Sequence, residues 1–413
     1  MHRIRILTFL AAAVFFLTAC GPLPNSGEDT PAGGDFTYVP DTTRAADLSA
    51  LGYRSVWFSY FEWQTTDCSS EDAFRDAVRT VCRNTASLGL NWITVQVRPF
   101  GDAVYPSSIF PWSHVVTGTQ GAAPSFDPLA VFIEEAHAAG LSFEAWINPY
   151  RVRLTESLPS QLADSNPAVT HPDWVREANG GLYYDPAIPE VQQMIVEGVR
   201  EVVANYDVDG VQFDDYFYPT TDASFDAETY AVYGGGQALD AWRRENVNTL
   251  VKTVYETVKT EKPDVRFGIS PQGNNDNNYN GQYSDVALWM SEPGYVDYVL
   301  PQVYWGYGYT LQSGSQRFAF ENITAEWAAM ERCDAVELYF GLGAYRIGDG
   351  DGGANDQTQW SSGHNLADQV NTLSETAGAS GVSLYPYRYL FANGEHPELA
   401  AAECEALRGL LAS

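Results

Sequence analysis

The sequence has few basic residues and lacks the motifs that usually mark metal or nucleotide chemistry. It contains 23 Lys and Arg against 53 Asp and Glu, a formal net charge of −30. Such a surface repels the phosphates of nucleic acids and of anionic lipids, so we expect no nucleic-acid partner. The six histidines show no HExxH or paired spacing, and no glycine-rich phosphate loop follows the first predicted strand. We therefore expect no metal and no cofactor.

Two loops have a calcium-like composition but not the spacing of a calcium loop. Residues 274–280 (NNDNNYN) and 348–357 (GDGDGGANDQ) do not fit the EF-hand pattern, so we interpret both as Asn/Asp/Gly loops. Cysteine is also scarce and has no metal-ligand spacing. Four cysteines follow the N-terminal segment, an even number that permits disulfides in an exported protein but leaves the pairing open: Cys68, Cys82, Cys333 and Cys404.

The N-terminus predicts export. Arg3 and Arg5 precede a short apolar stretch at residues 6–17, which is too short for a comfortable membrane span. The stretch ends in LTACG, which resembles a bacterial lipobox, so we expect cleavage to leave Cys20 carrying lipid. The alternative is an ordinary signal peptide with Cys at its cleavage site. We predict a signal peptide at 1–20, a flexible Gly/Pro-rich tether at 21–50, and a lipid anchor as the only membrane contact.

Residues 51–413 alternate short β-rich segments with longer helical ones, which predicts an α/β fold of the (β/α)8 TIM-like barrel type. A doubly wound sheet with a second domain is the alternative. The predicted strands are 54–60, 91–99, 141–149, 209–216, 265–270, 295–305, 337–343 and 381–387. The predicted helices include 69–89, 127–140, 188–206, 238–260, 324–333, 365–378 and 396–411.

The strands share an asymmetry between their two faces. In five of them one face is aliphatic, whereas the other becomes polar or aromatic toward the C-terminal end. In a barrel the aliphatic face meets the helices, and the second face lines the interior and opens at the top, where active sites lie. Residues expected on that second face include Arg98, Glu144, Trp146, Asn148, Asp214, Tyr216, Gln302 and Tyr304.

These side chains are carboxylates, amides and aromatics, a set that suits hydrolysis of a glycosidic bond by two carboxyl groups. Asp214 follows strand 209–216 in the inward phase and is the first candidate. Asp215 is out of phase, so we expect it to face the rim or the helix layer, in a supporting or turn role. Glu144 is a candidate second carboxylate or a structural partner of Arg98. Further carboxylate candidates are Glu62, Asp102 and Asp185.

Other residues have the chemistry to bind a sugar. Polar side chains can hold hydroxyl, carboxylate or N-acetyl groups, and aromatic rings can stack on pyranose faces or simply pack in the core. The candidates for substrate binding are Arg98, Asp102, Trp146, Asn148, Arg151, Tyr216, Gln302, Tyr304 and Trp305.

Several blocks of the sequence resemble bacterial glycosyl-hydrolase-like family ten, once a domain of unknown function. They include QVRPFGDAVYPS, AWINPYRV, DGVQFDDYFYP, FGISPQG and VDYVLPQVYW, and the similarity runs from about residue 53 to 390. The resemblance implies a TIM-like barrel in exported or lipid-anchored bacterial proteins that are regarded as glycosidases. At least one branch of that family cleaves peptidoglycan strands stripped of stem peptides. The chain departs from the family where Glu144 stands in place of a His, and at LYYDP.

These observations predict a surface-anchored glycoside hydrolase that faces the cell wall and cleaves peptidoglycan strands by paired-carboxylate catalysis. Two alternatives stay open. The protein could be a non-catalytic glycan-binding lipoprotein that keeps the mouth of the barrel, or a hydrolase of another extracellular polysaccharide.

Overall fold

The structure is a computed structural model that describes residues 48–354 and 358–411. The chain divides into two units, residues 1–36 and 37–413, and all described residues belong to the second. The predicted signal peptide, the lipidation site Cys20 and most of the predicted tether lie outside the described residues.

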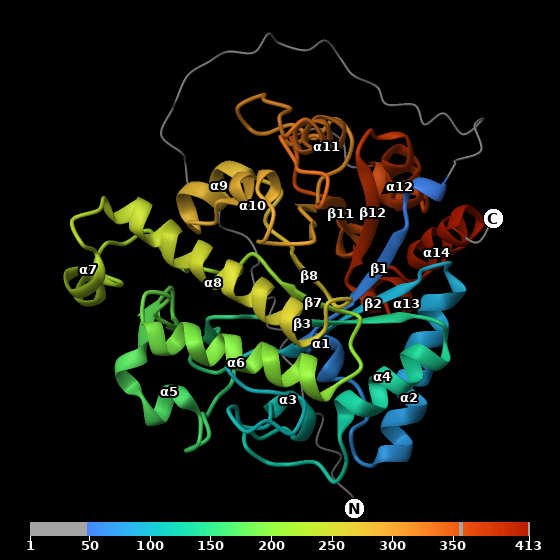
Figure 1. Cartoon of the computed structure of the whole chain (residues 1–413). Helices are drawn as coiled ribbons and strands as arrows, with labels where there is room; N and C mark the ends of the chain where they lie inside the picture. The colour runs from blue at the N-terminus through green and yellow to red at the C-terminus, as the bar shows by residue number, and fades with distance from the viewer. Residues whose placement is uncertain (1–47, 355–357, 412–413) are drawn as a thin grey trace, which may run out of the picture. The chain divides into compact units, whose positions relative to one another are not determined.

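The central element is a closed parallel barrel (Figure 1). Its sheet runs β10-β11-β12-β1-β2-β3-β7-β8-β9, and an additional β11–β9 pairing closes the ring. The segments β9 and β10 are two short pieces of the sixth strand, so the barrel has eight strands, as predicted. The strands are β1 (Tyr53–Phe58), β2 (Trp92–Arg98), β3 (Ser142–Ile147), β7 (Gly210–Phe213), β8 (Arg266–Ile269), β9 (Tyr298–Val299), β10 (Gln302–Val303), β11 (Glu337–Gly343) and β12 (Ala379–Tyr385).

Helices follow the barrel strands, and a small antiparallel sheet is inserted after β3. That sheet consists of β4 (Arg151–Arg153), β5 (Val175–Ala178) and β6 (Gly181–Tyr184). Within the described ranges, no helix is long and apolar enough to cross a bilayer. The helices are α1 (Tyr60–Trp63), α2 (Glu71–Ser87), α3 (His114–Thr117), α4 (Pro128–Ala138), α5 (Pro167–Thr170), α6 (Pro189–Asn205), α7 (Ala227–Tyr233), α8 (Leu239–Glu261), α9 (Asn275–Gly281), α10 (Val286–Ser291), α11 (Phe320–Ala328), α12 (Asn365–Glu375), α13 (Tyr387–Phe391) and α14 (Pro397–Leu411).

The helix α2 illustrates how local sequence positions the outer layer. Ser70 caps its N-terminus by accepting a hydrogen bond from the Ala73 N–H at 3.2 Å. The apolar residues Phe74 and Val78, four positions apart, bury one face of the helix against the core. The opposite, polar face makes ion pairs with the next helix.

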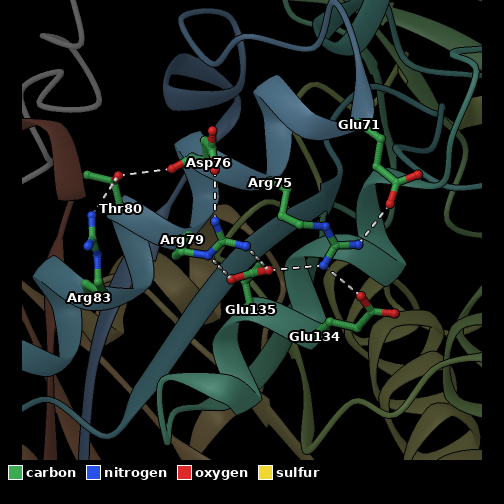
Figure 2. Close-up of polar contacts among 8 residues, drawn as sticks. All are labelled: Glu71, Arg75, Asp76, Arg79, Thr80, Arg83, Glu134 and Glu135. Atoms are coloured by element: carbon green, nitrogen blue, oxygen red, sulfur yellow. Dashed lines mark hydrogen bonds and ion pairs between the residues drawn. The ribbon is translucent and has the colours of Figure 1, made fainter.

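An arginine–carboxylate cluster joins α2 to α4 (Figure 2). Arg75 Nη1 lies 2.9 Å from Glu134 Oε2, and Arg79 Nε lies 2.9 Å from Glu135 Oε2. Because Arg75 and Arg79 are partly exposed, these ion pairs add little to the stability of the fold. The cluster aligns two outer helices and touches none of the residues at the mouth, so Glu135 offers a control position for mutagenesis.

The two faces of the barrel strands separate as predicted. The outward aliphatic side chains, such as Val95 and Val211, belong to the large core shared with the helices. The interior holds a second, aromatic cluster made of Tyr53, Trp57, Trp146, Tyr298, Leu300 and Tyr339. The barrel interior is therefore filled with side chains and opens only where the strands end.

All four cysteines that fall in the described residues are free. Cys82 and Cys404 are buried, and burial raises the pKa of the Cys82 thiol to about 12. The disulfides that the even cysteine count permits are absent from this part of the chain, so the fold is held by its core.

Candidate active site

Two neighbouring carboxylates, Asp214 and Asp215, lie at the C-terminal end of β7. They are 3% and 6% exposed, so both are almost removed from solvent. The paired register of β7 with β3 and β8 ends at Phe213, and the two acids follow in irregular backbone. The C-terminal ends of barrel strands are where TIM-barrel enzymes carry their catalytic groups. This position makes the pair the candidate catalytic centre.

Asn148, at the end of β3, holds Asp214. Its amide Nδ2 donates a short hydrogen bond to Asp214 Oδ2, and the Tyr216 backbone N–H donates to Asp214 Oδ1 at 3.3 Å. The orientation of the Asn148 amide is itself set, because its Oδ1 accepts from Gln96 and, at 3.0 Å, from Arg151 Nη2. Asp214 is thus positioned by a chain of amides and one guanidinium from β2, β3 and β4.

Asp215 turns toward the other side of the mouth. Its Oδ2 accepts from Gln272 Nε2 at 2.9 Å and from Gln282 Nε2 at 3.4 Å, and its Oδ1 accepts from Gln302 Nε2 at 3.1 Å. The prediction that Asp215 faces the rim or the helix layer is therefore wrong. The reason is that regular alternation stops with the ladder at Phe213, so the period of two does not extend to the second acid.

The two carboxyl groups have different electrostatic environments. Burial raises the pKa of Asp214 to about 7, and the adjacent negative charge of Asp215 adds to this, whereas Arg151 opposes it. Burial also raises the pKa of Asp215, but hydrogen bonds from Gln272, Gln302 and Gln282 favour its ionised form. The donors around the two carboxyl groups therefore differ, as they do in sites where one carboxyl group is the acid and the other is ionised. Asp214, with a pKa of about 7, is suited to hold a proton near neutral pH, and three side-chain donors stabilise the charged form of Asp215.

Partly exposed tyrosines surround the pair. Tyr304 stacks on Tyr385 with ring centroids 5.8 Å apart, and Tyr345 meets Tyr304 edge-on at 5.5 Å. Tyr216 lies under the Arg151 guanidinium at 5.6 Å from its ring centroid. Flat, half-buried rings beside carboxylates provide surfaces on which sugar rings can stack. The predicted mouth residues Tyr216, Gln302 and Tyr304 are thus brought together with Asp214 and Asp215.

Two predicted aromatic residues have different positions. Trp146 is 8% exposed and packs edge-on near Tyr385, with ring centroids 6.5 Å apart, and its indole Nε1 has no hydrogen-bond partner. Trp146 therefore belongs to the floor of the mouth. Trp305, in contrast, stacks on Phe318 at 5.0 Å and packs against the large core, so the structure does not bring it to the mouth.

Glu144 lies in the barrel interior, two positions before Trp146 along β3. It has no exposed surface and accepts hydrogen bonds from Tyr53, Thr94, Gln212 and Tyr298. Burial raises its pKa. The side chain had the predicted inward phase, but every nearby donor is already directed at it and none of its surface is accessible. The structure therefore makes Glu144 a member of the interior polar network, rather than a group that could reach a substrate.

A bulge turns Arg98 away from the mouth. The β2–β3 register shifts between Gln96 and Arg98, so Arg98 pairs with the outward residue Ile147. Its guanidinium is fully buried, lies 4.4 Å from the Phe110 ring centroid, and donates from Nη2 to the Pro149 carbonyl at 2.7 Å. The predicted inward phase is therefore wrong for Arg98. It holds the backbone that carries Asn148.

The remaining candidate carboxylates accept hydrogen bonds from neighbouring loops and helix ends. Asp102 accepts from the Phe100 N–H at 3.2 Å and from Gln120 Nε2 at 3.0 Å, and it has no exposed surface. Glu62 closes a capping box with Ser59 on α1. Asp185 accepts from Thr229 Oγ1 at 2.9 Å. These groups stabilise loops at the C-terminal end of the barrel, and the structure does not bring Asp102 into contact with the Asp214–Asp215 pair.

Sequence reasoning missed three residues of the site: Gln272, Gln282 and Tyr345. Gln272 comes just after a predicted strand, as Asp214 does, so the same strand-end rule could have found it. Gln282 lies in a loop after α9, and Tyr345 in the short 3-10 helix Ala344–Arg346, where periodicity has no meaning. No sequence signal pointed to these two.

One group with metal-ligand chemistry occurs among the described residues, and it lies outside the mouth. Asp349, Glu395 and His396 each offer a ligand atom within 4.8 Å of the others. Asp349 and Glu395 are exposed, and His396 already makes a 3.0 Å ion pair with Asp349. An ordinary surface ion pair accounts for this contact, so we assign no ligand to the group.

Comparison with known proteins shows the family of this chain. Residues 53–362 match the family described as Glycosyl hydrolase-like 10, which is three quarters of the chain. The chain belongs to the glycosyl hydrolase-like 10 family. It is 38% identical over 318 residues to the glycosyl hydrolase YngK of Bacillus subtilis, covering 71% of this chain and 61% of that protein. It is 35% identical over 380 residues to the glycosyl hydrolase DigH of Escherichia coli K12, covering 84% of each. Membership of this family confirms the resemblance, and at this level the predicted glycoside hydrolase.

Solved structures support the fold of this family member. The glycoside hydrolase domain of PgaB (BpsB) from Bordetella bronchiseptica superposes with a TM-score of 0.57 at 15% identity, covering 87% of this chain and 98% of that one. An α-L-fucosidase isoenzyme 2 from Paenibacillus thiaminolyticus gives 0.52 at 15% identity, covering 86% and 49%. At such low identity the likeness concerns the barrel alone.

Proposed function

We propose that the protein hydrolyses glycosidic bonds in the glycan strands of cell-wall peptidoglycan, with Asp214 as the general acid. The observation that carries the proposal is the buried Asp214–Asp215 pair, whose members are held by different sides of the mouth. The two groups differ in what acts on them: burial and the charge of Asp215 raise the pKa of Asp214 to about 7, whereas three side-chain donors favour charge on Asp215.

Hydrolysis requires a proton for the departing oxygen and negative charge near the anomeric carbon. Protonated Asp214 supplies the proton as the bond to the leaving sugar breaks. Ionised Asp215 stabilises the positive charge that develops on the sugar ring. The released Asp214 carboxylate then accepts a proton from the incoming water, which returns the site to its starting state.

The substrate class follows from the surface around the pair and from the predicted export of the chain. The partly exposed rings of Tyr216, Tyr304, Tyr345 and Tyr385 provide surfaces on which sugar rings can stack. A strongly acidic protein exported with a lipid on Cys20 would meet cell-wall glycan first. Replacing Cys20 by Ser should release the protein from the membrane fraction; unchanged membrane association would contradict the anchor.

The experiment that tests the proposed function is digestion of peptidoglycan strands freed of stem peptides, followed by mass spectrometry of the products. The wild type should release shorter saccharides with new reducing ends, and Asp214→Asn should reduce the rate by about 10² to 10⁴. Glu135→Gln on the helix layer is the matched control and should leave the rate unchanged.

Two outcomes would contradict this proposal, and each would support a different function. Cleavage of an unrelated polysaccharide but not of denuded strands would make the protein a hydrolase of another glycan. Binding of strands without any cleavage, equal in wild type and Asp214→Asn, would make it a glycan-binding protein.

A further inference from the structure

Asp215 is an unusual candidate for a nucleophile because its oxygen atoms are almost fully occupied. A carboxylate offers about four lone-pair positions for hydrogen bonds. Two glutamines donate to Oδ2 and Gln302 donates to Oδ1, so three of these positions are taken by side chains from outside β7. Attack on a sugar carbon would draw negative charge out of the carboxylate and weaken these three hydrogen bonds. One lone-pair position on Oδ1 stays open to a further N–H or O–H donor.

No other carboxylate takes the nucleophile's place in the described part of the chain. The remaining acids at this end of the barrel, Glu62, Asp102 and Asp185, are held by capping or loop contacts, and Glu144 is enclosed in the interior. None of them hydrogen-bonds to Asp214, to Asp215 or to the amides that hold them. The site thus has an acid and a fully oriented charge, and it lacks a free carboxylate to form a covalent bond.

The floor of the mouth contains an unsatisfied donor. The indole Nε1 of Trp146 is buried without a partner, and Trp146 is 8% exposed. A buried donor without an acceptor is unfavourable. Tyr385 lies beside the indole with its ring edge-on, and it stacks on Tyr304, which is close enough to Asp215 for the charge of that group to act on it. A substrate group with an N–H would match the open position on Asp215, and the aromatic side of the mouth suits a methyl group.

We propose that the reacting sugar carries a 2-acetamido group and that the carbonyl oxygen of this group forms the bond to the anomeric carbon, while Asp215 positions its N–H. The inference rests on the proposed function, because peptidoglycan sugars carry this group. Asp215 is then a substrate-positioning residue, and the protein forms no covalent bond to the sugar.

Hydrolysis takes place in two steps, formation of a cyclised sugar and its opening by water. The acetamido oxygen forms a bond to the anomeric carbon as the bond from that carbon to the leaving oxygen breaks, and Asp214 gives its proton to the leaving oxygen. The N–H stays hydrogen-bonded to ionised Asp215, which offsets the positive charge on the resulting oxazolinium ring. Water then attacks the anomeric carbon and loses a proton to Asp214. The ring opens to restore the acetamido group, so the configuration at the anomeric carbon is retained.

The decisive probe is a set of denuded strands that differ only in the acyl group on nitrogen. Strands are de-N-acetylated chemically and then re-acylated with either acetyl or trifluoroacetyl groups. Trifluoroacetyl keeps the N–H and the shape of the amide but weakens the carbonyl oxygen as a nucleophile. We expect re-acetylated strands to be cleaved like native strands, and trifluoroacetylated strands to be cleaved at least about tenfold more slowly at saturation.

Two further measurements separate this inference from a covalent mechanism. An N-acetylglucosamine-derived thiazoline, which mimics the cyclised intermediate, should inhibit the wild type and bind at least about tenfold more weakly to Asp215→Ala. Equal cleavage of acetyl and trifluoroacetyl strands, or labelling of Asp215 by a 2-fluoro sugar, would overturn it. If native strands are not cleaved at all, the proposed function itself fails, which is a separate result.

Discussion

Asp214 and Asp215 are adjacent in the chain, yet their carboxylates are bound by donors that follow the two strands on either side of β7: Asn148 after β3 and Gln272 after β8. Two like charges at one strand end repel each other, and the site separates them by giving each its own donors. This arrangement allows one group to keep a proton while the other stays ionised. Changes to the residues that hold this pair, and to Glu144 in the barrel interior, should have measurable effects.

The rate of glycan cleavage should fall on the alkaline side of pH 7. Asp214, with a pKa of about 7, must be protonated to act as the acid, and the protonated fraction decreases about tenfold per pH unit above that value. The measurement is kcat/KM for denuded strands over about two pH units on either side of that pKa. A rate that stays flat through about pH 9 would exclude Asp214 as the acid.

Asp214 should also make stability depend on pH. Its pKa is raised in the folded state to about 7, whereas an unfolded Asp titrates near 4, so the folded protein binds the extra proton between these values. The stability contributed by this group is complete below about pH 4 and is lost as the pH rises toward 7, by at most about 1.4 kcal/mol per unit.

Asp214→Asn should remove this dependence. Urea unfolding of the variant and the wild type should give similar stability at about pH 4 and a relative gain for the variant at about pH 8. The Glu135→Gln protein is a comparison of opposite sign: hydrogen bonds from Arg79 and Arg75 outweigh burial and lower the pKa of Glu135, so this variant changes the pH dependence at the acidic end only. Parallel pH curves for wild type and Asp214→Asn would show that Asp214 titrates normally.

Asn148→Ala should lower activity and move the alkaline limb of the pH profile upward. The Asn148 amide favours the charged form of Asp214, so its loss raises the pKa of the acid further. It also frees Arg151 from its 3.0 Å contact with Asn148 Oδ1. We expect kcat to fall by about 10- to 100-fold because the acid is no longer oriented. A fall in kcat with an unshifted limb would indicate that Asn148 orients Asp214 without lowering its pKa.

Glu144→Gln should affect folding more than catalysis. The interior donors, including Gln212 Nε2 at 3.0 Å and Tyr298 Oη at 2.5 Å, all point at the Glu144 carboxylate, and the new amide nitrogen would face donors instead of accepting from them. We expect a loss of about 1–3 kcal/mol in the free energy of unfolding. The rate per folded molecule should stay within a few-fold of wild type; a loss of about 10² or more would restore Glu144 as a catalytic group.

Much of the barrel could be predicted from the sequence because each strand and helix is marked by a pattern within its own residues. Apolar and polar residues alternate along β3 and β7, and amphipathic helices such as α2 lie between strands, so the fold class and the inward set around Asn148 and Asp214 follow from periodicity. These features depend on burying one face of each segment, which is a property of the segment itself.

The positions that differed from prediction depend on contacts between distant segments. Arg98 faces outward because the β2 register slips against β3, and no pattern within β2 records that slip. Asp215 enters the mouth because Gln272 and Gln302, about 60 to 90 positions later in the chain, supply its donors.

The sequence by itself thus determined the eight-strand barrel, its inward faces and the placement of two acids at a strand end. Only the tertiary structure decided which way each acid turns, and that Glu144 is enclosed by Tyr53 and Tyr298 in the interior. The physical reason is that a strand's period reports burial, whereas the orientation and pKa of a carboxylate are set by donors that converge on it from other strands.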